Sequence, residues 1–375
     1  MKKIVIIGPA HPLRGGLASY NERLAKAFQD QGHDVEIFTF SLQYPGFLFP
    51  GTTQFSSEPA PKNLKINVCI NSVNPLNWLK VGTRLRKMRP DLIVVRYWLP
   101  FMGPCLGTIL RLVKKNNHTK VVCIADNIIP HEKRPGDKAF TRYFMKPIDG
   151  FITMSEKVLK DLSLFQSTVP AKFVPHPLYD NFGNQVSITD ARNHLQISEK
   201  DRVVLFFGFI RHYKGLDILF DTIACLKHRN NAFSDIKFLI AGEFYEDRKP
   251  YDEHIEKLGI RDSLILRTDF IPDSEVKYYL CASNVVIQPY RSATQSGVTP
   301  LAYHFEKPMI VTNVGGLPAL VPHMKVGLIA EPNSESLADA IEIYFSTGEN
   351  TFVPGIIEEK KKYSWDVMTR EIFSI

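Results

Sequence analysis

Ten short apolar runs, arranged in two sets of five, constrain the fold of this chain more than any other feature of its sequence. Segments long enough for helices separate the runs. Strands that are apolar throughout are typical of parallel sheets covered by helices on both faces. The two sets therefore predict an α/β fold with two Rossmann-like, doubly wound domains. The runs are Ile4–Ile7, Val35–Phe40, Leu92–Arg96, Val121–Ile124 and Phe151–Met154, then Val203–Phe207, Phe238–Ile240, Leu264–Leu266, Val285–Ile287 and Met309–Thr312.

The boundary between the two predicted domains falls in a segment rich in residues that interrupt helices and strands. Val174–Val186 contains two prolines, a glycine and two asparagines. We place the change of domain near residue 180, with an N-terminal domain over 1–180 and a C-terminal domain over 181–357. Residues 358–375 end amphipathically, which favours a final helix that could cross back onto the first domain. The two domains are expected to face each other across a cleft at the carboxyl ends of their sheets.

The composition indicates a folded chain with a basic surface. The 375 residues are 44% hydrophobic, which favours a well-buried core over disorder. The net charge of +7 favours anionic partners such as nucleotides or acidic lipid headgroups, although an ordinary basic protein explains the same excess. The five cysteines are odd in number and form no CxxC, so we expect reduced thiols, no zinc site and a cytoplasmic location. The first apolar run stops too early for a signal peptide, and no apolar run of the sequence is long enough for a transmembrane helix.

The loop after the first apolar run of the second half is the strongest candidate for binding phosphate. Leu205–Leu216 reads LFFGFIRHYKGL, a strand that runs into Gly208 and is followed by Arg211 and Lys214 ahead of a helix. Phosphate binds best where positive charge lies beside the free N–H groups of a helix N-terminus. Two cations three residues apart beside a glycine are more specific than a lone charge, so this segment predicts a phosphate site.

Three further loops of the second half also follow predicted strands. Glu243 lies in the turn after one strand and Phe270 in the turn after the next, where backbone groups could meet the edge of a nucleobase. Pro289–Gly297 reads PYRSATQSG and closes at a helix start, where N–H groups are expected to hold a second phosphate. A plain connection between elements explains each of these turns as well.

In the first half, polar residues gather in two strand-end loops. The pair Gly15-Gly16 lets the backbone approach a diphosphate or an acceptor, although a tight turn into a helix explains it too. It is not part of a GxGxxG pattern, so a dinucleotide is not indicated. Ala125–Gly136 reads ADNIIPHEKRPG, in which Asp126 and His131 could bond a sugar hydroxyl or orient an acceptor, whereas a solvated loop is the alternative.

The loop after the third strand combines aromatic residues with a cation. Val95–Pro104 reads VRYWLPFMGP, and its aromatic rings with Arg96 could line a groove for a sugar or a lipid. Packing in the core explains them equally, and we favour the core for Trp98 and Phe101.

In this order and spacing the motifs resemble the retaining GT-B glycosyltransferases of family GT4, over almost the whole chain. The matching positions are Gly15-Gly16, Gly208, Lys214-Gly215, Gly242-Glu243, Phe270-Ile271-Pro272, Ser296-Gly297, Lys307-Pro308 and Val314-Gly315-Gly316-Leu317. The resemblance implies an acceptor in the N-terminal domain and a UDP- or GDP-linked sugar in the C-terminal domain.

The resemblance also implies roles for individual residues. Arg211 and Lys214 would neutralise the leaving diphosphate, and Asp126 and His131 would take part in catalysis beside the acceptor. No DxD motif follows a strand, so transfer without a metal or other cofactor is expected. The residues assigned to the nucleotide sugar are Gly15, Gly16, Gly208, Glu243, Phe270, Gln295, Ser296, Gly297 and Val298.

Four positions depart from the family pattern. The family's usual histidine after the fourth strand falls near Asp126, with His131 five residues later. The arginine that usually follows the glycine is Phe209 here, and Arg211 comes two residues later. The paired glutamates of the family would fall at Ala293 and Leu301, and leucine cannot hold ribose hydroxyls. Gln295, Ser296 or the backbone would then do so. A related bacterial branch with DNxxPHE and TQSG loops is similar, which makes these differences subfamily features.

The predicted reaction is transfer of a hexose to a hydroxyl with retention at the anomeric carbon, in glycan or polysaccharide assembly with a carbohydrate or lipid-linked acceptor. A catalytically inactive GT-B scaffold or nucleotide-binding protein is the main alternative, and Ala293 and Leu301 favour it. An epimerase would need acid and base carboxylates, for which Asp126, Glu132 and Glu243 are the candidates. A nucleic-acid partner is disfavoured, because the basic residues form no stripe with interleaved aromatics.

A peripheral contact at the inner face of the plasma membrane is left open. A bilayer of acidic lipids suits cations and apolar residues that share one helix, although a solvated helix face explains the same residues. The cations are Arg84, Arg86, Lys87 and Arg89, and the apolar residues are Trp78, Leu79 and Leu85.

Overall fold

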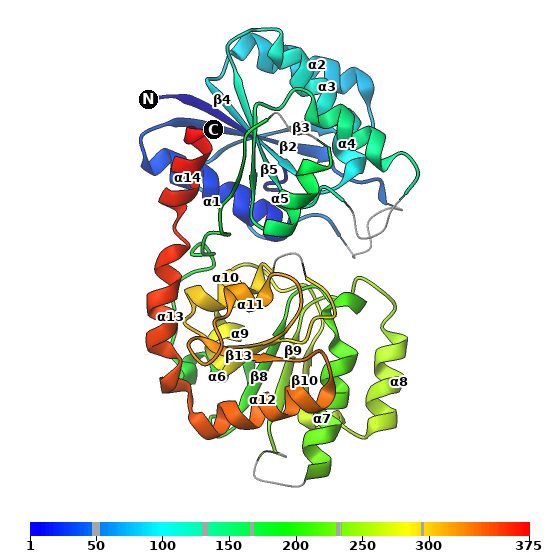
Figure 1. The fold of residues 1–375 in the computed structure, drawn as a ribbon, viewed down its shortest axis with the longest axis vertical. Coiled ribbons are helices and arrows are strands. Elements are labelled where there is room, and N and C mark those ends of the chain that lie inside the picture. The colour runs from blue at the N-terminus through cyan, green and yellow to red at the C-terminus, as the bar shows by residue number, and fades with distance from the viewer. Residues whose placement is uncertain (47–52, 130–133, 166–168, 230–232, 234, 294–295) are drawn as a thin grey trace. The chain divides into compact units, whose positions relative to one another are not determined.

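The computed structural model describes residues 1–46, 53–129, 134–165, 169–229, 233, 235–293 and 296–375. Its contacts divide the chain into two compact units: unit 1, Met1–Pro177 with Ser364–Ile375, and unit 2, Leu178–Tyr363. Each unit is built around one sheet of parallel strands with helices packed against it (Figure 1). The predicted fold class, two Rossmann-like parallel-sheet domains, is confirmed.

The sheet of unit 1 has seven strands in the order β3-β2-β1-β4-β5-β6-β7. The order reverses between β1 and β4, and the loops that follow these two strands therefore leave in opposite directions. In doubly wound sheets, ligands bind at such a point, outside the carboxyl ends of the strands. The strands are β1 Lys3–Ile7, β2 Asp34–Leu42, β3 Lys65–Asn71, β4 Leu92–Tyr97, β5 Lys120–Ala125, β6 Gly150–Thr153 and β7 Ala171–Phe173.

Most helices of unit 1 pack their apolar side against the sheet. One buried cluster joins Ile93 and Val95 of β4 to Leu85 of α2 and to Leu106 and Ile109 of α3. Burial of such side chains is the main force that holds each layer in place. The helices are α1 Gly16–Asp30, α2 Pro75–Met88, α3 Gly103–Lys114, α4 Asp137–Met145, α5 Glu156–Ser163 and α14 Trp365–Ser374, with a 3₁₀ turn at Pro100–Met102.

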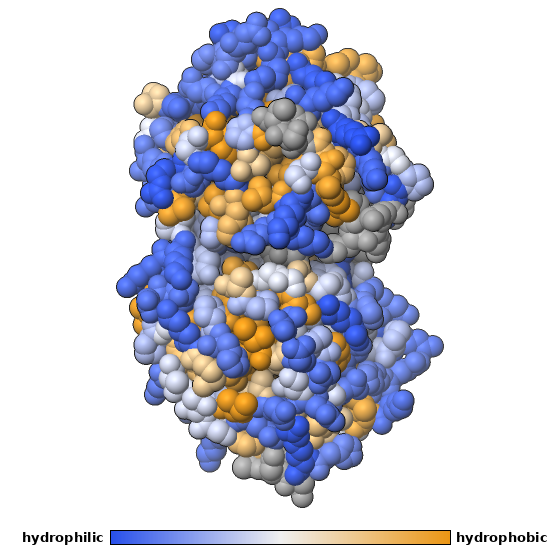
Figure 2. Space-filling view, in the orientation of Figure 1, coloured by the Kyte–Doolittle hydropathy of each residue, from blue (hydrophilic) through white to orange (hydrophobic). Residues whose placement is uncertain are grey.

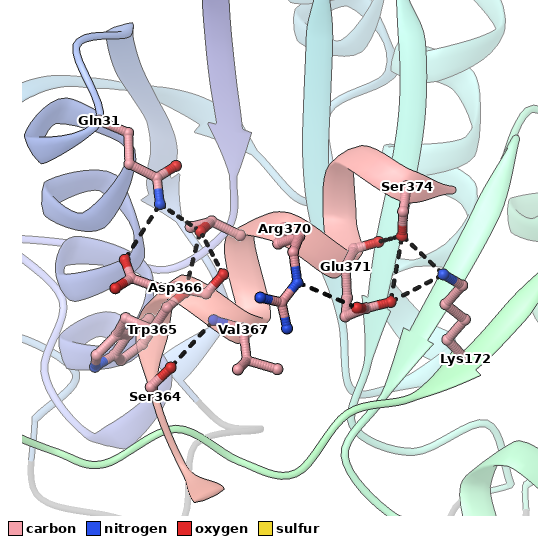
Figure 3. Close-up of polar contacts among 10 residues, drawn as sticks. Gln31, Lys172, Ser364, Trp365, Asp366, Val367, Arg370, Glu371 and Ser374 are labelled. Atoms are coloured by element: carbon pink, nitrogen blue, oxygen red, sulfur yellow. Dashed lines mark hydrogen bonds and ion pairs between the residues drawn. The ribbon is translucent and has the colours of Figure 1, made fainter. Parts of the chain in front are cut away.

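The last helix of the chain, α14, packs in unit 1 although the residues before it belong to unit 2. Ser364 caps its N-terminus, its Oγ accepting a hydrogen bond from the Val367 N–H. Polar contacts hold α14 at two places, where Gln31 donates to Thr369 (2.7 Å) and Lys172 pairs with Glu371 (2.9 Å; Figure 3). The predicted final segment, residues 358–375, thus comprises the end of one helix, a 3₁₀ turn and α14.

Unit 2 repeats the same plan with six strands in the order β10-β9-β8-β11-β12-β13. Its order reverses between β8 and β11. The strands are β8 Val203–Phe207, β9 Lys237–Ala241, β10 Leu264–Arg267, β11 Val285–Gln288, β12 Met309–Thr312 and β13 Gly327–Ala330. The helices are α6 Ile188–Leu195, α7 Leu216–Arg229, α8 Lys249–Leu258, α9 Val276–Ala282, α10 Val298–His304, α11 Leu317–Leu320, α12 Ser334–Thr347 and α13 Val353–Glu359, with 3₁₀ turns at His212–Lys214, Arg261–Ser263, Glu349–Thr351 and Lys360–Lys362.

The apolar runs predicted ten strands, and the structure adds β3, β7 and β13. All three lie at the edges of their sheets. β3 and β7 are less buried, as edge strands often are, so their sequences do not need a continuous apolar run, whereas β13 (GLIA) is apolar and mostly buried. In β3, KINVCIN, polar residues interrupt the pattern and only Ile70 is fully buried.

His176, one residue before the first segment of unit 1 (Met1–Pro177) ends, is buried. The ring of Tyr20 in α1 lies edge-on to His176 and contacts Trp365, with ring centroids 5.0 Å apart in both pairs. His176 Nδ1 donates to the Pro177 carbonyl oxygen (2.6 Å). Burial lowers the pKa of His176 to about 3, and the charge of Arg96 acts in the same direction.

The buried imidazole predicts that acid destabilises unit 1. Between pH 6.5 and 3 the unfolded chain binds a proton at His176 that the folded chain does not, so stability falls as the pH is lowered. The loss reaches on the order of 4 kcal/mol. Urea unfolding at pH 7, 5 and 4 should show a steeper decline for wild type than for His176→Gln. His228→Gln, which alters an exposed histidine of unit 2, is the control, and equal slopes for wild type and His176→Gln would contradict the prediction.

Candidate functional site

The turn after β8 brings a glycine and a buried lysine together. Gly208 has a φ of +96°, and a Cβ there would lie 3.0 Å from Lys214 Nζ. Lys214 is only 8% exposed, and its Nζ lies 5.7 Å from the ring centroid of Tyr290. Burial and, next, the charge of Arg211 lower the pKa of Lys214 to about 7. Among the described residues no carboxylate pairs with this ammonium, which makes it suited to an incoming anion.

A row of three partly exposed aromatic rings lies beside Arg211. Phe209 stacks on Tyr245, with centroids 4.2 Å apart, and lies 6.4 Å from Phe270 at nearly the same tilt. These residues follow β8, β9 and β10, which are neighbours in the sheet. The Arg211 guanidinium carbon lies 5.3 Å from the Tyr245 ring centroid. The row therefore offers flat apolar faces next to a cation, an arrangement that suits a planar ring beside a phosphate.

The loop after β11 closes the other side of the Gly208 turn. Val298, the first residue of α10, has a Cγ2 atom 3.7 Å from where a Cβ on Gly208 would lie. Ser296 Oγ accepts a hydrogen bond from the Val298 N–H (3.2 Å). Burial raises the pKa of Tyr290, and a hydrogen bond with Ser296 lowers it by a smaller amount. This tyrosine therefore stays neutral at physiological pH between the lysine and the serine.

Glycines allow the loops after the strands to touch. Gly315, after β12, has a φ of +55°, and a Cβ there would lie only 1.7 Å from the Ala293 carbonyl oxygen. A Cβ on Gly215 would lie 2.0 Å from the Pro289 carbonyl oxygen. No other residue fits at either place without moving the backbone. Ala293 and Leu301, the positions that the sequence resemblance assigns to paired glutamates, are both buried and are part of the packing of this chain.

Most residues predicted for the second half lie around this turn. The Glu243 backbone oxygen accepts a hydrogen bond from the Ile210 N–H (2.8 Å), which ties the loops after β8 and β9 together. Phe270 joins the group through Phe209. Tyr290 and Tyr245 were not predicted as site residues, although Tyr290 lies within Pro289–Gly297 and Tyr245 lies two residues after Glu243. Of the predicted site residues, His131 and Gln295 lie outside the described part of the chain.

In unit 1 the glycine pair precedes α1 as predicted. Gly15 has a φ of +99°, which permits the sharp turn into the helix that starts at Gly16. The preceding Arg14 donates from Nε to the Thr53 carbonyl oxygen (2.7 Å). The loop after β1 is therefore fastened to a later loop, and Gly15 and Gly16 lie at the carboxyl end of the sheet.

Asp126 follows β5 and is part of a buried ion pair. Arg96 of β4 donates to both of its carboxylate oxygens, each at 2.5 Å, and the two side chains are almost fully buried. The ring of Tyr20 lies under the Arg96 guanidinium at 4.0 Å. Paired in this way, Asp126 is better suited to holding the strand ends together than to exchanging protons. Trp98 and Phe101 pack against the core, as expected.

No described helix is both long enough and apolar enough to cross a bilayer. Three or more His, Cys, Asp or Glu side chains that could share a metal ion do not come together in the described part of the chain.

Comparisons with known proteins cover both units. The family model described as Glycosyltransferase Family 4 matches residues 14–176, and the model described as Glycosyl transferases group 1 matches residues 187–351. D-inositol 3-phosphate glycosyltransferase of Corynebacterium glutamicum is 24% identical over 96% of this chain and 91% of its own. An uncharacterised glycosyltransferase of Methanocaldococcus jannaschii is 26% identical, but over only 49% of this chain and 47% of its own.

A solved structure supports the fold over its full length. Anabaena Alr3699/HepE, in complex with UDP and glucose, aligns with a TM-score of 0.74 at 15% identity, covering 99% of this chain and 98% of its own. The parallel sheets, the turn around Gly208 and the two family matches point to the same assignment. The chain belongs to the GT-B glycosyltransferases of family 4.

Proposed function

We propose that this protein is a retaining, metal-independent transferase that moves a hexose from a nucleotide diphosphate sugar to a hydroxyl acceptor. The observation that carries the proposal is the buried Lys214 ammonium beside Gly208, with Arg211 three residues before it. Cations in a desolvated pocket bind a diphosphate strongly, because water competes little for either charge. Glycan or polysaccharide assembly, with a carbohydrate or lipid-linked acceptor, is the proposed setting.

UDP is the nucleotide that the comparisons favour for this proposal. HepE has been solved with UDP bound, and its fold covers almost all of this chain. The aromatic row at Phe209, Tyr245 and Phe270 would lie under the base, next to the cations that hold the phosphates. GDP remains the competitor to be tested beside it.

The proposed reaction breaks the bond between the anomeric carbon and the diphosphate oxygen and forms one to the acceptor oxygen. Negative charge grows on the departing phosphate, so Arg211 and Lys214 bind the transition state more tightly than the ground state. The departing phosphate oxygen accepts the acceptor proton, so no separate carboxylate base is required. The engagement of Asp126 by Arg96 fits such a mechanism.

Donor binding is expected to weaken as the pH rises above 7. The pKa of Lys214 is about 7 in the free protein, and a bound diphosphate stabilises the ammonium and raises it. The complex then binds more protons than the free protein above pH 7, so affinity falls, at most about tenfold per pH unit. UDP-glucose suits the test because its diphosphate does not titrate in this range. Calorimetry at pH 6.5, 7.5 and 8.5 should show that the affinity of wild type for UDP-glucose falls with pH and that binding takes up protons. Lys214→Met should show neither effect.

Calorimetric titration with UDP, GDP, ADP and their common sugar conjugates tests the proposed function. Binding of one nucleotide class with loss in Lys214→Met would support the donor site. Transfer that persists in EDTA, and a product with the anomeric configuration of the donor by NMR, would support the mechanism. Nucleotide binding without turnover of any donor would favour the inactive scaffold. The buried Ala293 and Leu301, which stand where glutamates are expected, favour that alternative.

A further inference from the structure

Tyr290 lies two residues after β11 and contacts both sides of the site around Gly208. The residue is buried, with only 3% of its surface exposed. Lys214 Nζ lies over its ring, 5.7 Å from the centroid, and its hydroxyl forms a hydrogen bond with Ser296. This one side chain therefore reaches from the lysine of the loop after β8 to the serine of the loop after β11.

Contacts on two sides fix the position of Tyr290. The Thr312 hydroxyl of β12 donates to the Tyr290 carbonyl oxygen (2.6 Å). The N–H of Arg291, the next residue, donates to the Tyr213 carbonyl oxygen (2.8 Å), and the rings of Tyr213 and Tyr290 meet edge to face with centroids 6.1 Å apart. The ring is thus held between β12 and the turn that carries Lys214.

Lys214 depends on its neighbours because it is removed from water. Lys249 and Lys257 of α8 are exposed, and Figure 2 shows mostly hydrophilic residues where Figure 1 draws this helix. Lys214 is only 8% exposed, and burial lowers its pKa to about 7. A lysine in such a setting stays charged only as far as protein groups replace the lost water.

No carboxylate of the described residues pairs with the Lys214 ammonium. Asp217 of α7 pairs with an arginine of the loop after β11, and Glu246 accepts a hydrogen bond from a backbone N–H of the lysine's own turn (2.9 Å). Glu243 is buried in the loop after β9 but does not raise the pKa of Lys214. The group that supports this charge is therefore a neutral one.

Tyr290 suits that part because its ring is aromatic and uncharged. The face of such a ring attracts a cation that lies within about 6 Å of its centroid. Burial raises the pKa of Tyr290 and that of Tyr213 beside it, so both stay neutral, whereas Arg211 repels the ammonium. A neutral ring stabilises the ammonium without cancelling its charge, which stays available to an anion.

We propose that Tyr290 is a positioning residue of the transfer reaction, whose ring holds the Lys214 ammonium ready for the donor diphosphate. The hydrogen bond with Ser296 keeps the ring at the angle that presents its face to the lysine. Tyr290 acts through Lys214 and need not touch the donor itself. The inference rests on the proposed function, in which that lysine binds the diphosphate.

Replacing the ring tests the proposal through its pH dependence. In Tyr290→Leu the ammonium loses its support, so the pKa of Lys214 falls, by about one unit for a contact of this kind. Calorimetry of the full chain with UDP-glucose should then show binding about tenfold weaker than wild type at pH 8.5, where the free lysine is mostly neutral in both proteins. At pH 6, where it is mostly charged in wild type, the loss should be only about twofold. Tyr290→Phe keeps the ring and should bind within about threefold of wild type at both pH values.

A second comparison asks whether Tyr290 acts through the lysine. Lys214→Met has no ammonium to support, so adding Tyr290→Leu should change its kcat/KM at pH 8.5 by less than about twofold. Tyr344→Leu is the matched control, since Tyr344 of unit 2 is 1% exposed and donates its hydroxyl to the Asn284 carbonyl oxygen (2.6 Å). This variant should lose stability in urea and yet bind UDP-glucose like wild type at both pH values.

Three results would overturn the inference. Equal weakening of Tyr290→Leu at pH 6 and pH 8.5 would mean that the ring only fills space. A loss in Tyr290→Phe as large as in Tyr290→Leu would assign the effect to the hydroxyl, and a loss that persists in Lys214→Met would separate it from the lysine. Tyr290→Met, whose longer side chain fills more of the space, replaces Tyr290→Leu if that variant does not fold. Wild type that binds no nucleotide sugar, or wild-type binding in Lys214→Met, would instead contradict the proposed function.

Discussion

Replacing Lys214 by methionine is expected to lower kcat/KM for the donor by about 10²–10³. One well-placed group that stabilises developing negative charge contributes roughly this factor. The Lys214 ammonium is buried beside Gly208, where water competes little for its charge. Lys214→Ala should lose at least as much. Steady-state kinetics with the nucleotide sugar that titration identifies would measure the effect.

The same substitution should stabilise the fold at neutral pH. The pKa of Lys214 is about 7 when folded and 10.5 when unfolded, so the unfolded chain binds more protons between these values. The buried ammonium therefore costs stability at pH 7 and below, on the order of 4 kcal/mol, and the cost disappears as the pH rises toward 10.5. Lys214→Met should resist urea better than wild type at pH 7, and the difference should be smaller at pH 9.5.

The control is Lys249→Met, which replaces an exposed lysine of α8 and should change neither activity nor stability. Wild-type kinetics in Lys214→Met would remove this lysine from the mechanism.

Asp126→Asn is expected to destabilise the protein by about 3–5 kcal/mol. The substitution leaves the Arg96 guanidinium buried without its carboxylate, and an uncompensated buried charge is expensive. Urea unfolding of the full chain should show the loss. Arg96→Met/Asp126→Leu, which removes both charges, should recover most of the stability, because well-packed apolar residues replace such pairs at little cost.

The exposed pair of Lys26 and Asp30 in α1 provides the matched control. Asp30→Asn breaks an ion pair of the same kind in water and should cost less than about 1 kcal/mol. If Asp126 instead acts on the substrate, Asp126→Asn would fold with wild-type stability and lose turnover. That outcome would support the catalytic role predicted from the sequence, and the double variant would then be stable and inactive.

Central strands and local loops were predictable from the sequence. Central strands are largely buried, so most of their residues are apolar, and nine of the ten predicted runs are central strands. The tenth, Leu264–Leu266, lies in the edge strand β10. The edge strands β3 and β7 carried no such mark, because they are less buried, whereas β13 (GLIA) is short, apolar and mostly buried and was missed all the same. The cation pair was equally visible, since Gly208, Arg211 and Lys214 lie within seven residues of one another.

The partners of these residues were not predictable. Arg96 and Asp126 are 30 positions apart and meet because β4 and β5 pair in register, Arg96 with Ile124 and Tyr97 with Ala125. Phe209, Tyr245 and Phe270 come from three loops that the order of β8, β9 and β10 brings side by side. The pattern of each loop says nothing of its neighbour, so the ion pair of Asp126 with Arg96 was not predictable, and the catalytic role predicted for Asp126 stays a prediction.

By itself the sequence determined two parallel α/β domains and predicted a phosphate site at the Gly208 turn, because burial and helix-start chemistry act on residues close together in the chain. Only the tertiary structure decided which side chains meet. Strand order and register placed Arg96 on Asp126, set Gly315 against Ala293 and returned α14 to unit 1. These contacts depend on packing between segments that are distant in the sequence, and a local sequence pattern does not predict the free energy of that packing.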